Sequence, residues 1–272
     1  MQKDSIGQAF KVILGICLVC SFLVSAASVF LNPIQRDNQR LDRIKNILIA
    51  GGLYTEGIDI ETTYRDKIEP VMIDLRTGEP VEADRFGDSP DTDDFDIQSF
   101  AADPEYGEPV PAEEDRAKIK RRPRQMVVYF VKPGARLDKL ILPIYGKGLW
   151  STLYGFVTLE RNLRTIAGIA FYQHGETPGL GGEIDNPRWQ SQWRGKRAFD
   201  NRGKVIIEVL RGAVAPLSDS ADHQIAGLSG ATITSRGVDN LVKYWLGKRG
   251  YGPFLSRLRR EWVAAGMDSD RR

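Results

Sequence analysis

The sequence predicts an α+β protein: a single N-terminal transmembrane helix followed by one domain built on a mixed or antiparallel sheet. An uncharged apolar run occupies Val12–Leu31, short β-rich segments follow one another after Gln125, and helical periodicity returns near the C-terminus. We divide the chain into an N-terminal anchor (1–35), a stalk helix with an acidic, partly extended segment (36–124), and a sheet domain with C-terminal helices (125–272).

The composition excludes several classes of function. The 272 residues carry 38 basic and 36 acidic side chains, whereas nucleic-acid binders gather a basic excess on one face. The two cysteines exclude a disulfide scaffold or a Cys-rich zinc site, and His174 and His223 lie far apart in the sequence. We therefore predict no metal site and no nucleic-acid partner, and few routes to catalysis by protein groups alone.

The N-terminal apolar run is long enough to span a bilayer. As a helix, the 20 residues of Val12–Leu31 rise roughly 30 Å, the thickness of the hydrocarbon core. A cleaved signal peptide is the alternative, because Lys3 and Lys11 form a basic start and Ser25–Ala27 offers small residues. The apolar run continues past that small patch, which favours an uncleaved anchor.

The charges around the anchor leave its orientation open. Counting basic residues slightly favours a cytoplasmic C-terminal domain, but long domains translocate largely regardless of nearby charge. Cys17 and Cys20 share one helix face within the anchor. They could be metal ligands or an acylation site; we interpret them as small apolar residues, because no partner ligand is visible.

The segment 36–124 begins with a predicted stalk helix. Leu41, Ile44 and Leu48 recur at helical spacing, and Gly51-Gly52 is a plausible stop, which predicts a helix over 37–49.

An acidic stretch follows the stalk. Residues 82–115 hold thirteen acidic side chains, one arginine and four prolines, a composition typical of extended, solvated chain. A cation site is the alternative, but no glycine-centred calcium-loop spacing supports it. Its candidate ligands are Asp91, Asp93, Asp94 and Asp96.

The sheet domain is predicted from five short β-rich runs, at 126–131, 140–144, 153–159, 165–171 and 205–210. Pro143 is expected at a strand end because proline cannot donate to a ladder, and Glu160-Arg161-Asn162 is expected to form a hairpin turn. Apolar residues at helical spacing predict a helix over 238–246 that Gly247 ends, and a closing helix around 255–262.

A glycine-rich loop at 227–237 leads directly into the 238–246 helix. Glycines let peptide N–H groups approach a phosphate, and a helix N-terminus offers unpaired donors. The loop lacks the lysine of a Walker A motif, so nucleotide hydrolysis is not implied. The alternative is a plain turn in which Ser235 caps the helix.

Two further glycine clusters lie at 146–151 and 174–183. Trp150 in the first could stack on a flat ligand, although core packing is the commoner use of tryptophan. The second could wrap a planar ligand or simply form a long connection rich in turn residues. Together the three loops could line one pocket for a flat ligand.

Two other functions remain possible from the residues alone. Ser229, with His174 or His223 as its base, could form a serine hydrolase site; Gly227 fits a nucleophile elbow, but Ala231 does not. A membrane-tethered sensor or solute-binding domain could instead hold an anion in its glycine loops without covalent attachment.

These motifs together resemble one family. Ser229-Gly-Ala-Thr232 resembles the flavinylation motif of FMN-binding domains, in which FMN is joined through its phosphate to the final threonine. Gly-Lys-Gly-Leu-Trp-Ser (146–151), Glu-Thr-Pro-Gly-Leu-Gly (176–181) and Tyr-Trp-Leu-Gly…Gly-Tyr-Gly-Pro-Phe-Leu (244–255) are similar to motifs of the C subunits of the Na⁺-translocating NADH:quinone reductase (Nqr) complex. The resemblance covers the anchor and most of residues 125–258.

The resemblance implies roles for individual residues. Thr232 would carry one covalent FMN per chain, on a turn of Ser229, Gly230 and Ala231 that a Mg²⁺-dependent flavin transferase recognises. Thr234 and Ser235 would be secondary phosphate or helix-cap groups. The inferred pocket residues are Trp150, Glu176, Thr177, Leu180 and Gly181. The sequence departs from the motif at Ala226, where an aspartate often stands six positions before the threonine.

The resemblance also implies a function. The chain would be an electron-transfer subunit without a complete active site of its own, receiving electrons from an iron–sulfur centre in neighbouring membrane subunits. It would pass them to the flavin of the B subunit and ultimately to ubiquinone, while Na⁺ is pumped. Its partners would be the A, B, D, E and F subunits. It would be a single-pass protein of the bacterial inner membrane with a periplasmic domain.

Overall fold

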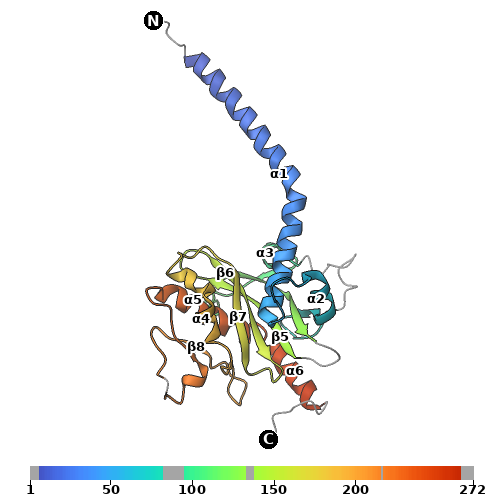
Figure 1. Cartoon of the computed structure of the whole chain (residues 1–272), viewed down its shortest axis with the longest axis vertical. Helices are drawn as coiled ribbons and strands as arrows, with labels where there is room; N and C mark the ends of the chain where they lie inside the picture. Colours follow the sequence, from blue (N-terminus) through green and yellow to red (C-terminus); the bar gives the residue numbers. More distant parts are fainter. Residues whose placement is uncertain (1–5, 82–94, 133–137, 216, 265–272) are drawn as a thin grey trace. The chain divides into compact units, whose positions relative to one another are not determined.

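Five antiparallel strands form the central sheet, in the order β1-β4-β5-β6-β7 (Figure 1). The computed structural model describes residues 6–81, 95–132, 138–215 and 217–264. Four strands fall where the sequence predicts them: β4 (Gln125–Val131), β5 (Lys139–Lys147), β6 (Thr152–Glu160) and β7 (Ile166–Gln173). Their β-branched and aromatic side chains suit a pleated, buried surface. The predicted α+β class with an antiparallel sheet is confirmed.

Pro143 was expected at a strand end, and this prediction is wrong. The residue lies in the middle of β5, opposite Phe156 of β6. The pairing of β5 with β4 stops at Ile141, so the chain beyond it has a partner strand on one side only. The carbonyl of Pro143 accepts a hydrogen bond of 2.6 Å from the buried Tyr251 hydroxyl. A locally free edge therefore tolerates proline inside the strand.

The fifth predicted run, 205–210, contributes only the short strand β8 (Glu208–Val209). It pairs in parallel with β9 (Gln224–Ile225), outside the main sheet. The N–H of Val209 donates to the carboxylate of Asp239 at 2.9 Å. This peptide group is thus satisfied by a helix side chain.

The segment 36–124 contributes a strand that the sequence did not reveal. After the short helix α2 (Ile60–Lys67), strand β1 (Ile68–Asp74) pairs along its whole length with β4. Its composition conceals it, because it includes Glu69, Pro70 and Asp74. As an edge strand, β1 can carry these residues on its unpaired or exposed positions.

The described part of the acidic stretch is folded, not extended as expected. It forms helix α3 (Ile97–Ala102) and strand β2 (Gly107–Pro109), which pairs with β3 (Arg121–Pro123). The acidic side chains stabilise turns: the carboxylate of Asp96 caps α3 by accepting from the N–H groups of Gln98 and Ser99. Asp96 is therefore a helix cap; the other three candidate cation ligands lie outside the described residues.

Two C-terminal helices, α5 (Thr232–Leu246) and α6 (Gly252–Ala264), confirm the predicted amphipathic segments. Helix α5 packs on β5, where the indole N–H of buried Trp245 donates to the Tyr145 carbonyl at 2.7 Å. Gly247 follows the last residue of α5, as predicted. This packing fixes where the N-terminus of α5 lies relative to the loop that follows β5.

Helix α1 (Ile6–Gly51) includes both the apolar run and the predicted stalk. Residues 1–43 form one unit of the chain and residues 44–272 another. In the first unit, Gly7–Asn32 has a mean hydropathy of 2.5 and is long and apolar enough to cross a membrane, with its side chains exposed. In the second unit, Ile44, Ile47 and Leu48 are buried in the core.

Candidate functional site

The N-terminus of α5 presents Thr232 at the surface. Gly230, with φ +72°, makes the left-handed turn that precedes the helix, and Ala231 follows as an N-cap residue without a capping side chain. Thr232 is exposed, and within the described residues its hydroxyl makes no hydrogen bond. The first turn of α5 thus combines a free hydroxyl with peptide N–H groups that no side chain of the N-cap residue satisfies.

Ser235 does not cap the helix as expected, because α5 begins three residues earlier. Its side chain is buried in the first turn, where Oγ accepts a hydrogen bond of 2.9 Å from the N–H of Leu228. Ser235 therefore fixes the turn before Thr232 from inside the protein.

Glu176 joins the three predicted loops. Its carboxylate accepts hydrogen bonds from the peptide N–H groups of Leu149, Trp150 and Ser151, at 3.2, 2.9 and 3.1 Å. It also accepts a 2.6 Å hydrogen bond from the buried Thr234 hydroxyl on α5. One carboxylate thus holds the 146–151 loop, the 174–183 loop and the start of α5 together. The sequence predicted that these loops meet, but it did not identify the group that joins them.

The carboxylate of Glu176 is ionised in this environment. Burial by itself raises the pKa of Glu176, but the hydrogen bonds from Thr234, Ser151, Trp150 and Leu149 outweigh it and lower the pKa below its ordinary value. Only 5% of the residue is exposed, so hydrogen bonds from neutral protein donors, and not water, stabilise the charge. Glu176 and Thr234 support the site from beneath its surface.

Glycines allow the loops to approach one another closely. A Cβ added at Gly181 would lie 2.6 Å from Thr234 Oγ1 and 2.8 Å from Glu176 Oε2. One at Gly148 would lie 2.6 Å from Glu176 Oε1, and one at Gly237 would lie 2.5 Å from the Lys147 carbonyl oxygen. Gly148 and Gly181 leave the space that the Glu176 network occupies, and Gly237 lets α5 approach the main chain of the 146–151 loop.

Gly181→Ala is expected to lower the free energy of unfolding by about 1–3 kcal/mol, because the new methyl group overlaps the Glu176–Thr234 hydrogen bond. The measurement is urea-induced unfolding of the detergent-solubilised chain. Gly168→Ala is the matched control, since no atom lies within 4 Å of its added Cβ. Equal stability of the two variants would contradict the close packing described above.

Apolar side chains are exposed on the three elements that Glu176 joins. Trp150 is 68% exposed, so it is not a core residue; Leu149 on the same loop, Leu180 on the 174–183 loop and Ile233 next to Thr232 on α5 are also exposed. Leu180 lies near the turn, since a Cβ on Gly230 would approach Leu180 Cδ2 to 3.0 Å. Thr177 is exposed, and its carbonyl closes the turn by accepting from the N–H groups of Leu180 and Gly182. A flat, partly apolar group with a phosphate suits this surface.

The hydrolase alternative finds no support in the geometry. His174 contacts Asp185 through Nε2 at 2.7 Å, and His223 contacts Asp222 through Nδ1 at 2.7 Å. Within the described residues, neither ring hydrogen-bonds to Ser229. The serine is exposed on the turn before α5 without a base.

Ala226, the departure from the motif, is held through its main chain. Its N–H donates to Gln192 Oε1 at 3.0 Å, and its carbonyl accepts from the indole N–H of Trp189 at 2.8 Å. The backbone before the 227–231 turn is therefore fixed without a polar side chain at position 226.

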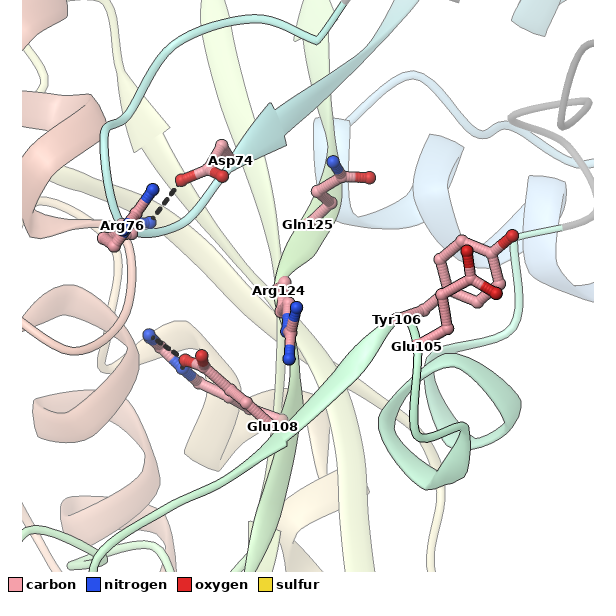
Figure 2. A pocket seen from close by; sticks show the side chains of 8 residues that line it. Asp74, Arg76, Glu105, Tyr106, Glu108, Arg124 and Gln125 are labelled. Atoms are coloured by element: carbon pink, nitrogen blue, oxygen red, sulfur yellow. Dashed lines mark hydrogen bonds and ion pairs between the residues drawn. The ribbon is translucent and has the colours of Figure 1, made fainter. Parts of the chain in front are cut away.

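A cavity of about 600 Å³ lies elsewhere, between the turn after β1 and the β2–β3 pair (Figure 2). Arginines and carboxylates line it, and none of the sequence motifs indicates it. Its buried Arg122 donates to Glu108 at 2.6 and 2.8 Å. The lining residues are Asp74, Arg76, Glu105, Tyr106, Glu108, Arg122, Arg124 and Gln125. None of the predicted site residues is among them.

Residues 148–247 match the model of the FMN-binding domain family, so the protein is a flavoprotein of the FMN-binding class. The chain is 44% identical over 262 residues to the Na⁺-translocating NADH-quinone reductase C subunit of Pseudomonas aeruginosa, covering 95% of this chain and 98% of that one. The corresponding C subunit of Haemophilus ducreyi is 42% identical, with 95% and 96% covered. The chain therefore belongs to the family of C subunits of Na⁺-translocating NADH-quinone reductase, an oxidoreductase complex.

The fold agrees with solved structures. Shewanella oneidensis NqrC superposes with a TM-score of 0.74 at 32% identity, covering 82% of this chain and 99% of that one. The C subunit of the Parabacteroides distasonis reductase gives a TM-score of 0.62 at 28% identity, covering 83% and 97%. The resemblance seen in the sequence motifs is confirmed at the level of the family and the fold.

Proposed function

We propose that Thr232 carries one FMN per chain through a phosphoester bond. The observation that carries this proposal is the exposed side chain of Thr232 at the first residue of α5, beside peptide N–H groups that the N-cap residue Ala231 does not cap. Those N–H groups and the helix dipole favour a phosphate at this position. Bound FMN would supply the electron-transfer chemistry, and the chain positions it.

The surrounding residues divide into two groups. Ser229, Gly230 and Ala231 form the turn that presents Thr232 to a separate flavin transferase. Trp150, Thr177, Leu180 and Gly181 lie on the loops that border the ring position, with Trp150 and Leu180 exposed there. Glu176 and Thr234 act by positioning, since their polar atoms are already hydrogen-bonded to each other.

We infer that the chain is an electron-transfer subunit of the Na⁺-translocating NADH-quinone reductase complex. Its place is between an iron–sulfur centre of the neighbouring membrane subunits and the flavin of the B subunit, on the route to ubiquinone. The A, B, D, E and F subunits are its partners. Its family membership and the surface position of Thr232, where a partner can approach, support this role.

We infer that Gly7–Asn32 anchors the protein in the bacterial inner membrane as a single span. Its length and exposed apolar side chains support this assignment. The N-terminus would lie inside the cell and the sheet domain in the periplasm.

The test of covalent attachment is the intact mass of the full chain, produced in its membrane with a flavin transferase and then denatured. We expect an increase equal to FMN less one water, located by digestion on the peptide that contains Thr232. Ala226→Asp provides a second sample in which the usual aspartate is restored. Loss of all flavin on denaturation in both samples would overturn covalent attachment and favour a non-covalent anion-binding or sensor domain.

A further inference from the structure

His174 lies directly behind the Glu176 network. It follows β7 and precedes the 176–183 turn, and its side chain is only 12% exposed. Its Nδ1 accepts a hydrogen bond of 3.1 Å from the peptide N–H of Glu176. Its Nε2 lies 2.7 Å from the carboxylate of Asp185, at the end of the 3₁₀ turn η2 (Gly181–Asp185). The ring thus ties both ends of the loop to each other.

These two contacts define the protonation state of the ring. A peptide N–H can only donate, so Nδ1 must be unprotonated to accept from Glu176. An ionised carboxylate only accepts, so Nε2 carries the proton toward Asp185. The observed geometry therefore requires the neutral Nε2–H imidazole. A second proton, on Nδ1, would point at the N–H of Glu176. Two donors would then face each other, and the hydrogen bond would be lost.

We propose that His174 is a positioning residue of the flavin site: its neutral ring holds the Glu176 peptide, and protonation of the ring releases that hold. Once released, Glu176 is held less firmly, and so are the groups that hydrogen-bond to its carboxylate: the N–H groups of the 149–151 loop and the hydroxyl of Thr234 at the start of α5. A gain of one proton at His174 loosens the loops that border the ring position. The effect on flavin rests on the proposed function; the effect on the loops does not.

The charged groups around His174 are consistent with this response. Asp185 faces Nε2 and remains a partner of the cationic ring. The carboxylate of Glu176 points away to the 149–151 loop and Thr234, and the carboxylate of Glu183 is bonded to Asn186. The Gly175 N–H donates to Ser151 Oγ at 2.7 Å, so the main chain beside the ring is anchored to the 146–151 loop as well.

The first test is amide hydrogen exchange of peptides covering 148–151 and 175–177, in the full chain carrying Thr232→Ala so that no flavin is attached. Exchange is measured at about pH 5.5 and about pH 7.5 and corrected for its intrinsic pH dependence. We expect exchange to become about fivefold faster at the lower pH, the effect of losing one hydrogen bond of ordinary strength.

Two variants separate positioning from general stability. His174→Asn keeps an acceptor near the Glu176 N–H and does not titrate, so its protection should stay high at both pH values. His174→Leu has no acceptor and should give fast exchange at both. The proposal is overturned if the exchange rates of the wild-type residue and of His174→Asn change equally with pH. It is also overturned if the amides of His174→Leu stay protected.

The second test measures the flavin midpoint potential against pH in the flavinylated chain and its His174→Asn variant. We expect the two curves to coincide at the higher pH and to separate as His174 becomes protonated. If the two curves of midpoint potential coincided at every pH, His174 would have no effect on the flavin, even where the exchange experiment showed its effect on the loops. Absence of covalent flavin would be a failure of the proposed function alone, because the exchange experiment uses unflavinylated protein.

Discussion

Replacement of Thr232 by valine is expected to abolish covalent FMN while leaving the domain folded. Valine keeps the branched shape of threonine but removes the hydroxyl oxygen that the phosphoester requires. Because Thr232 is exposed and its hydroxyl is unbonded within the described residues, the free energy of unfolding should change by less than about 0.5 kcal/mol. Intact mass and flavin absorbance after denaturation measure attachment, and urea unfolding measures stability.

Thr232→Ser is the matched control for this variant. It restores a hydroxyl on the same backbone position, so attachment should return. Covalent flavin retained in Thr232→Val would show that another residue carries the cofactor. A Thr232→Val chain that loses flavin but also unfolds would contradict the independence of this side chain from the fold.

Glu176→Ala is expected to give the largest loss of stability among the site residues, about 2–4 kcal/mol in the free energy of unfolding. The substitution leaves three peptide N–H groups and the Thr234 hydroxyl without their acceptor. Glu176→Gln should lose less unfolding free energy, because one acceptor oxygen remains. Some loss is still expected, because the new side-chain NH₂ group faces donors that the carboxylate oxygen had accepted from. Urea unfolding at neutral pH measures both.

Glu183→Ala is the control for the loss of a loop carboxylate. Within the described residues, the side chain of Glu183 accepts one hydrogen bond, from the side-chain amide of Asn186. Its removal should cost no more than about 1 kcal/mol. If Glu176→Ala proved as mild as Glu183→Ala, Glu176 would not be the residue that holds the three loops together.

The same carboxylate predicts a pH dependence of stability. The pKa of Glu176 is lowered in the folded protein, so the ionised form is favoured by folding. Its contribution is complete above the ordinary value of 4.5, declines as the pH falls below it, and is lost beneath the folded-state pKa. Wild-type stability should therefore approach that of Glu176→Gln in acid.

The sequence predicted the parts of the fold whose pattern is local. The apolar run, the strands β4 to β7 and the amphipathic α5 each follow from a periodicity that their own residues display. Strand β1 was missed because its charged residues and proline conceal an edge strand. Pro143 was misplaced because its tolerance depends on where the pairing of β5 with β4 stops. Pairing partners distant in sequence determine both cases.

The candidate site could be predicted from the sequence only in outline, for a similar reason. Glycines and Thr232 could be read from motifs, and Trp150 was placed beside them. The role of Glu176 in joining the loops could not be read from a motif, because its hydrogen-bond partners lie between 25 and 58 residues away in the sequence. Nor does the spacing of His174 and Asp185 indicate that one imidazole bridges a peptide N–H and a carboxylate.

The unbonded hydroxyl of Thr232 has a consequence for protein quality control. Since the fold makes no use of that oxygen within the described residues, a chain without flavin at Thr232 should fold as a loaded one does. Proteases that remove unfolded polypeptides would then not distinguish the two. If Thr232 carries FMN as proposed, empty subunits would have to be avoided at another step, either by efficient transferase action or by selection when the subunits assemble.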